Sequence, residues 1–396
     1  MSTRTIEKVA KEPSPALVTV FAIATGALVA NLYYAQPLIA SIGREMGIKP
    51  DLAGSVVSVT QIGYGVGLFL LVSLADLVEN KRLALTLLAL TIVGLVAVAT
   101  STSTTLFFIA SFLVGLCSTS AQILVPFIAH LAPEARRGRI VGNVMAGVLT
   151  GIMLARPVAL FIAAHLGWRA VFWCSAVLMI LIGATLVRLM PKHQPSRGKH
   201  YFQILRSMVG LFRDMPVLRR RALYQALMFT AFNMYWTAAP LMLSDQLGMS
   251  QQGIALFALA GAGGALAAPV AGRLADRGYT RLMTLGAMLG LGLACYATSW
   301  AAAAHWLIAL VVLTVIFDAA IQTNQITSQR IIFSTPQDTR GRVNAIYMTI
   351  NFMGGAIGSV LGTMTYHAGG WSLTAETGGF IGALLLAIFA MKERES

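Results

Sequence analysis

The chain has 396 residues, of which 57% are hydrophobic and 11% are charged, and its mean hydropathy is +0.74. A soluble domain carries about 25% charged residues and cannot bury this much apolar surface, so the composition excludes an ordinary soluble protein. The formal net charge of +14 does not indicate nucleic-acid binding, because the basic residues lie in loops between apolar runs. These runs have the length of helices, which predicts an all-α polytopic membrane protein.

Twelve apolar runs predict twelve transmembrane helices, each near the length of about 20 residues that crosses some 30 Å of hydrocarbon. The runs lie at residues 16–40, 52–74, 82–101, 104–131, 140–165, 168–190, 221–246, 250–273, 281–301, 305–331, 343–366 and 371–391. The polar stretch 191–220 divides them into an N-terminal six-helix bundle, 16–190, and a C-terminal six-helix bundle, 221–391. Residues 1–15 and 392–396 form the tails. Within the linker, the apolar spacing of 201–212 predicts a short surface helix.

The basic residues predict the orientation of the chain. Of 29 lysines and arginines, 25 lie in the two tails, the linker and every second loop, whereas Arg44, Lys49 and Arg169 lie in the alternate loops. The positive-inside rule therefore predicts that both termini and the linker are cytoplasmic. The remaining basic residue, Arg156, lies inside the fifth span.

The two halves repeat one another. "PEARRGR" (133–139) matches "PQDTRGR" (336–342) at an offset of 203, and Gln122 matches Gln325 at the same offset. "SLADLVENKR" (73–82) and "GRLADRGYTR" (272–281) share Leu-Ala-Asp at an offset of 200. An even number of spans separates the equivalent positions, so the repeat is parallel. It predicts two pseudo-symmetric halves around a central path.

Over nearly its whole length the chain resembles the major facilitator superfamily, whose loop motif is roughly G-x-L-a-D-[RK]-x-G-[RK]-[RK]. The second copy matches through Gly272, Leu274, Asp276, Arg277 and Gly278. The first keeps Leu74, Asp76, Lys81 and Arg82 but has Ser73 for the leading glycine. "NLYYAQPLI" (31–39) and "GVLTGIMLARP" (147–157) resemble a bacterial branch of drug:proton antiporters of the acriflavine-resistance type. The resemblance implies a monomer in the bacterial inner membrane.

The resemblance also implies a gate at the cytoplasmic ends of the spans. Asp76 would bridge to Arg137 of a neighbouring loop, and Asp276 and Arg277 are the equivalent residues of the second copy. The alternative is a set of solvated charges at span ends. An exposed ion pair contributes only about 0–1 kcal/mol, but a small bias is enough between two states of similar energy.

Asp318 is the only carboxylate deep within a predicted span. Ionisable residues at this depth usually face a bundle interior or an aqueous cavity. We therefore expect a proton or substrate site at Asp318. The alternative is a permanently protonated acid that bonds to a neighbouring helix.

By the resemblance, spans one, four, seven and ten line the substrate cavity, and their polar and aromatic residues are the candidate wall. The candidates are Asn31, Tyr33, Tyr34, Gln36, Gln122, Gln225, Asn233, Tyr235, Trp236, Gln322 and Gln325. Neighbours such as Tyr33 and Tyr34 cannot both face inward, so only part of this set should line the cavity. Asn324 points away from the face that Asp318 shares with Gln322 and Gln325.

The fifth span resembles the antiporter signature of the superfamily, roughly g-x8-G-x3-G-P-x2-G-G. Gly138, Gly147 and Gly151 follow its spacing, whereas Arg156 replaces a closing glycine. Plain helix packing is the alternative reading of these glycines. Arg156 would extend to the outer surface, bond the backbone near Pro157, or face the cavity as an anion anchor or a partner of Asp318. By helix height, no direct pair with Asp318 is expected in an outward-closed state, and a water-bridged pair is the alternative.

These features predict a secondary active exporter of a small organic molecule or drug in exchange for protons. The alternative is a facilitator or exporter of a metabolite, such as a sugar, amino acid or organic anion, without this proton coupling. Ser111 stands where many proton-coupled relatives carry an arginine, so Arg156 would have to replace it. A membrane sensor without transport is a third reading. No Walker A motif, nucleophile–base set or metal cluster is visible, so no enzyme, cofactor, metal or nucleic-acid partner is expected.

Overall fold

A computed structural model describes residues 13–192, 200–265, 267–336 and 339–392. Over these residues the chain forms helices and no strand, which confirms the all-α prediction. The first half contains α1 (Pro15–Ala30), η1 (Gln36–Leu38), α2 (Ile39–Glu45), η2 (Pro50–Leu52), α3 (Ser55–Leu70), η3 (Val72–Asp76), α4 (Asn80–Thr100), α5 (Thr104–Ser118), α6 (Ala121–Leu131), α7 (Glu134–Leu166) and α8 (Trp168–Leu189). The linker contains α9 (Tyr201–Asp214). The second half contains α10 (Pro216–Asp245), α11 (Gln251–Ala258), α12 (Ala260–Ala265), α13 (Ala267–Asp276), α14 (Thr280–Ala303), α15 (Leu307–Ile332) and α16 (Arg340–Lys392).

Eight helical segments in the described chain are long and apolar enough to cross a membrane. One of them, Arg340–Met391, has 52 residues and contains two predicted spans. Its backbone leaves the helical conformation at Gly369 and Gly370, and Gly370 has a φ of +66° that favours glycine. The turn between the last two spans therefore lies where the sequence predicted it. Most of both predicted tails lies outside the described residues.

Several predicted spans are interrupted, among them 52–74, between α3 and η3, and 104–131, between α5 and α6. Two other interrupted runs contribute to the candidate site. The run 16–40 is helical only to Ala30 in α1 and resumes as η1 and α2. The run 250–273 is interrupted at Leu259, between α11 and α12. Residues 261–264, Gly-Ala-Gly-Gly, follow this break and lie within α12. Both breaks lie close to the candidate site.

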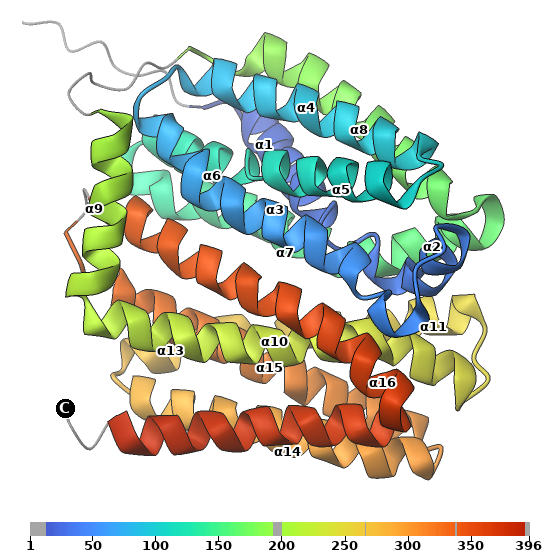
Figure 1. Ribbon diagram of the computed structural model, residues 1–396. Coiled ribbons are helices and arrows are strands. Elements are labelled where there is room, and N and C mark those ends of the chain that lie inside the picture. Colours follow the sequence, from blue (N-terminus) through green and yellow to red (C-terminus); the bar gives the residue numbers. More distant parts are fainter. Residues whose placement is uncertain (1–12, 193–199, 266, 337–338, 393–396) are drawn as a thin grey trace, which may run out of the picture.

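The long helices run side by side, and α9 crosses them at one end (Figure 1). We call this the basic end, because the sequence predicts that the basic loops lie there, and we call the other the opposite end. Each half packs within itself, as α1 does against α6, α7 and α8, and α10 against α16. The halves meet where α3 packs on α16 and α7 on α11. Near the opposite end, the Gly54 N–H donates to Thr363 Oγ1 (3.1 Å) and Ser58 Oγ donates to the Ala356 carbonyl (2.5 Å).

The predicted linker helix is confirmed as α9, which connects the two halves at the basic end. Tyr201 Oη donates to the Leu70 carbonyl of the first half at 3.0 Å. Arg342 of α16 donates to Ser207 Oγ at 2.6 Å. Phe202 is 81% exposed, so α9 also presents an apolar side chain away from the bundle.

Helix α7 carries Arg156 and crosses α1 in backbone contact. A Cβ atom on Gly147 would lie 2.3 Å from the Ala22 carbonyl oxygen, and one on Gly151 would lie 2.2 Å from that of Gly26. Only glycine permits this approach. A Cβ atom on Gly138 would meet no atom within 4 Å, so the packing role predicted for the three glycines does not extend to Gly138.

Candidate functional site

A cavity of about 420 Å³ lies between the two halves. Its inner end is formed by Tyr33, Arg156 and Asp318, in the middle of the helical layer. At the basic end its lining reaches Phe333, directly after α15, and Gly341, at the start of α16. Contacts between α3 and α16 and between α7 and α11 close the halves on the opposite side. The cavity therefore opens toward the basic end.

Asp318 lies at the inner end of this cavity and is 5% exposed. Trp236 Nε1 donates a hydrogen bond to its Oδ1 at 3.1 Å. Two glycines of α12 enclose the side chain: a Cβ atom on Gly261 would lie 2.8 Å from Oδ2, and one on Gly264 would lie 2.4 Å from the Asp318 Cβ. The glycines of α12 thus make room for the carboxyl group.

Arg156 is also 5% exposed, and three aromatic rings surround its guanidinium group. Its Cζ lies 5.1 Å from the ring centroid of Tyr33, 5.2 Å from that of Phe232 and 4.6 Å from that of Trp236. Its Nε donates to Gln36 Oε1 at 2.9 Å. Aromatic faces attract cations, and the attraction increases when water is excluded. The protein therefore stabilises this buried charge within the bundle rather than at the outer surface.

Arg156 and Asp318 form no direct ion pair, although both contact Trp236. The indole N–H faces the carboxylate while the ring face lies against the guanidinium. Trp236 therefore lies between the carboxyl group and the guanidinium group. This agrees with the expectation from helix height that Asp318 and Arg156 do not pair directly.

An amide network joins the halves beside Arg156. Gln36 Nε2 lies 3.3 Å from both Asn233 Oδ1 and Thr237 Oγ1, and Gln61 Nε2 donates to Asn233 Oδ1 at 2.5 Å. Gln61 was missed by the sequence analysis. Its signal was available, because an amide within the apolar run 52–74 needs a polar partner.

The predicted cavity residues separate into three groups. Tyr33, Gln122, Gln322 and Gln325 line the cavity. Gln122 Nε2 donates to the hydroxyl of Tyr64, a further lining residue that the sequence analysis did not select (3.1 Å).

Gln36, Asn233 and Trp236 form the second group, since they lie behind the inner end of the cavity and outside its lining. They contact Arg156, Asp318 or one another, so they position the charged groups without facing the open space. The sequence correctly predicted that these residues lie near the site. It placed them in the wall of the cavity, whereas they lie behind that wall.

The third group points elsewhere. Asn31 accepts a hydrogen bond from Ser175 of α8 at 2.6 Å, and Tyr34 lines a groove on the outer face of the first half. Gln225 accepts from Asn324 at 2.7 Å, and Tyr235 bonds Thr314 at 2.6 Å. The cavity role predicted for Asn31 and Tyr34 is wrong in this structure, because α1 ends at Ala30 and its helical period does not continue through them.

At the basic end, Asp276 forms an ion pair with Arg330 of α15, within the second half. Arg277 is exposed. The expected Asp76–Arg137 bridge is not formed: Arg137 Nε donates to the Ala129 carbonyl at 3.1 Å. Asp76 instead lines a side pocket of about 260 Å³. Both residues belong to the first half, and the bond of Arg137 to the Ala129 carbonyl takes the place of the expected pair.

Comparisons with known proteins agree with this architecture. A model of the Major Facilitator Superfamily matches residues 21–333 and 222–396. The chain is 38% identical to the uncharacterized transporter YgaY of Escherichia coli O157:H7, over 96% of each chain. It is 23% identical to the chloramphenicol resistance protein of Streptomyces lividans, over 68% of this chain and 69% of that one. It is 24% identical to the probable sugar efflux transporter of Mannheimia succiniciproducens, over 68% and 66%. A mutant of the nucleoside transporter NupG has a similar fold in its crystal structure, with a TM-score of 0.76 at 12% identity, over 94% of this chain and 99% of that one.

Proposed function

Because the chain belongs to the Major Facilitator Superfamily, we propose that it is a proton-coupled exporter that moves a small organic molecule out of the cytoplasm by alternating access. The positive-inside rule supports a cytoplasmic basic end. The structure would then represent the state in which the cavity is open to the cytoplasm. Residues 16–190 and 221–391 would move as two bodies joined by the linker 191–220.

One observation carries the proposal: a buried carboxyl group lies at the inner end of the cavity, beside Trp236. A carboxylate at membrane depth is costly unless a proton or a cation neutralises it. A proton and a cationic substrate cannot both neutralise Asp318 at once. Competition between them would couple the exit of the substrate to the entry of a proton, with no further co-reactant.

The alternative is an anion facilitator anchored by Arg156. Its guanidinium group is covered by three aromatic rings and bonded to Gln36 through Nε, which stabilises much of its charge, although its buried Nη2 has no hydrogen-bond partner. This favours a positioning role for Arg156 and a cation or proton site at Asp318. One relative is named for chloramphenicol resistance and another for sugar efflux, so the names of the relatives do not decide the substrate class. The experiment below decides it.

A gate at the basic end follows from the same cycle. Asp76 and Arg137 lie in the same half, so the closing of the halves does not by itself bring them together, and a pair between them would require a rearrangement within the first half. Asp276 would remain bonded to Arg330 and hold the end of α15, while its neighbour Arg277 is exposed.

The test uses purified protein in liposomes with an interior pH indicator, and a panel of lipophilic cations and small carboxylic acids. We expect cations to trigger proton movement in the wild type, and Asp318→Asn, which keeps the size of the side chain, to abolish it. Arg156→Gln should reduce this movement without changing which class of compound triggers it. Uptake of acids without proton movement, lost in Arg156→Gln and kept in Asp318→Asn, would refute the proposal and support the facilitator.

A further inference from the structure

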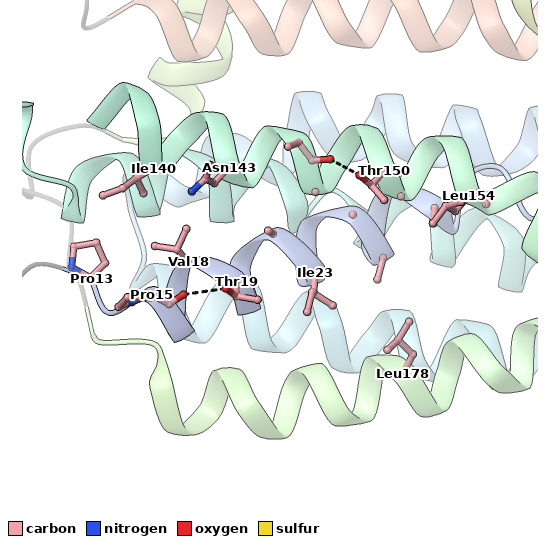
Figure 2. Close-up of a pocket in the computed structure, with 18 of the residues that line it drawn as sticks. Pro13, Pro15, Val18, Thr19, Ile23, Ile140, Asn143, Thr150, Leu154 and Leu178 are labelled. Atoms are coloured by element: carbon pink, nitrogen blue, oxygen red, sulfur yellow. Dashed lines mark hydrogen bonds between the residues drawn. The ribbon is translucent and has the colours of Figure 1, made fainter. Parts of the chain in front are cut away.

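A second and larger hollow lies on the outer face of the first half, with a volume of about 1020 Å³ (Figure 2). Its lining comes from α1 and α7, with Leu178 of α8 at one edge. It shares no lining residue with the central cavity, because α7 presents opposite faces to the two. The transport mechanism proposed above does not use this groove.

The groove is lined mainly by apolar side chains, and the threonine hydroxyl groups in it already have hydrogen-bond partners. Ile23 is 52% exposed and Leu154 is 46% exposed, and both lie along it. Thr19 and Thr150 also line it, but their hydroxyl groups bond carbonyls of their own helices, at 3.0 Å to Pro15 and 2.8 Å to Ala146 (Figure 2). Few polar groups in the middle of the groove are left for a ligand, so this part suits a hydrocarbon chain.

The charge of the groove is confined to the basic end. Arg136 and Arg139, in the first turns of α7, line this end and are exposed, and the amide of Asn143 lies one turn further along. No acidic residue is among the described residues that line the groove; Glu134 lies at the start of α7 outside the lining. The opposite end, at Leu154 and Val158, is uncharged. A ligand that fits has an anionic head at one end and an apolar tail.

We propose that this groove binds an anionic phospholipid from the leaflet at the basic end. Its phosphate would lie at Arg136 and Arg139, and an acyl chain would follow α7 toward Thr150. From Arg139 to Thr150 the helix rises about 16 Å, about half of the 30 Å hydrocarbon core, which is the depth of one leaflet. Anionic lipids of the cytoplasmic leaflet attract basic groups near the membrane surface. This matches the predicted orientation of the chain.

The test is native mass spectrometry of the full chain in detergent, titrated with phosphatidylglycerol or with phosphatidylcholine of the same acyl chains. We expect the wild type to bind one phosphatidylglycerol at least fivefold more tightly than phosphatidylcholine. The double variant Arg136→Gln/Arg139→Gln should lose this preference. Ala146→Phe, which fills the groove at an exposed position, should weaken the binding of both lipids.

Arg273→Gln is the matched control, because Arg273 is an arginine in the second half and lies outside the groove. It should leave the preference unchanged. Equal binding of the two lipids by the wild type would overturn the proposal. So would an equal loss in the Arg273 control, or displacement of the phospholipid by an equimolar single-chain fatty acid. None of these readouts depends on transport. The lipid site can therefore be confirmed when the proposed transport function fails, and it can be refuted when that function is confirmed.

Discussion

Arg156 is stabilised by residues that are distant from it in the sequence. Gln36, 120 residues away, accepts from its Nε, while Phe232 and Trp236 come from the other half of the chain. The depth of Arg156 and of Asp318 was predictable, because each is a charge within an apolar run. Their partners were not, since helix rotation and the pairing of spans are decided by packing between helices.

We expect Arg156→Met to lower the free energy of unfolding by about 1–3 kcal/mol, the cost of leaving a buried polar group without its partner. The group in question is Gln36 Oε1, which accepts from Arg156 Nε. The measurement is the thermal midpoint in detergent, with Arg273→Met as the control for loss of an arginine outside the buried network. Equal midpoints for the two variants would contradict the account of that network.

A pH effect is expected at the opposite end of the molecule. Trp168 Nε1 donates to Glu45 at 2.5 Å and Arg169 forms an ion pair with it. The Trp168 hydrogen bond, followed by the Arg169 contacts, lowers the pKa of Glu45 below its ordinary value. A lowered folded-state pKa stabilises the fold above the unfolded-state value, about 4.3, and this stabilisation is lost as the pH falls through the folded value.

The thermal midpoint of Glu45→Gln should therefore lie below that of the wild type at pH 7 by a constant small amount, since the pair is largely exposed. The difference should shrink below about pH 4.3, as the wild-type carboxylate becomes protonated. If the difference in thermal midpoint between the wild type and Glu45→Gln grows as the pH falls, the predicted direction of this pH effect is wrong.

At the scale of the helices, apolar runs predicted where spans lie and did not predict where they break. The first span leaves the helical conformation after Ala30, so Tyr33 faces the cavity and Asn31 faces α8. The break comes where the run is least apolar, between Asn31 and Pro37, so the residues there gave a sign that the hydropathy of the whole run does not show. The glycines of the eighth span were not such a sign, since 261–264 lie within α12 and the break comes before them, at Leu259.

Gly151 and Gly138 provide a matched pair for the contact between α1 and α7. We expect Gly151→Ala to reduce the yield and the thermal midpoint, because the new Cβ would lie 2.2 Å from the Gly26 carbonyl oxygen. Gly138→Ala should leave both unchanged or slightly raised, since its Cβ meets no atom within 4 Å and alanine favours the helix. Equal effects of the two substitutions would contradict the backbone contact.

At the scale of the whole molecule, the internal repeat predicted two halves, and the described helices pack in that way. It did not predict which end is open. Both states of an alternating-access protein use the same sequence and differ by a few kcal/mol, so local patterns do not select between them. Only contacts between the halves, such as Gly54 with Thr363, identify the closed end.

Accessibility of the cavity tests this arrangement. In a background without native cysteines, Gln325→Cys lines the cavity and should react with a membrane-impermeant maleimide applied to the cytoplasmic side. Adding Gly54→Val should reduce this labelling, because a Cβ at Gly54 would lie 1.9 Å from the Ser359 carbonyl oxygen and would separate α3 from α16. Labelling only from the outer side would show that the proposed orientation or the open end is wrong.

The central claim is that Asp318 exchanges a proton for the transported molecule. Its most direct measurement is proton release when a lipophilic cation from the liposome panel is added to the detergent-solubilised protein in a weakly buffered pH-indicator solution. The account predicts that the wild type releases protons in proportion to the cation bound, and that Asp318→Asn releases none. Cation binding by the wild type without proton release, or undiminished release by Asp318→Asn, would contradict it.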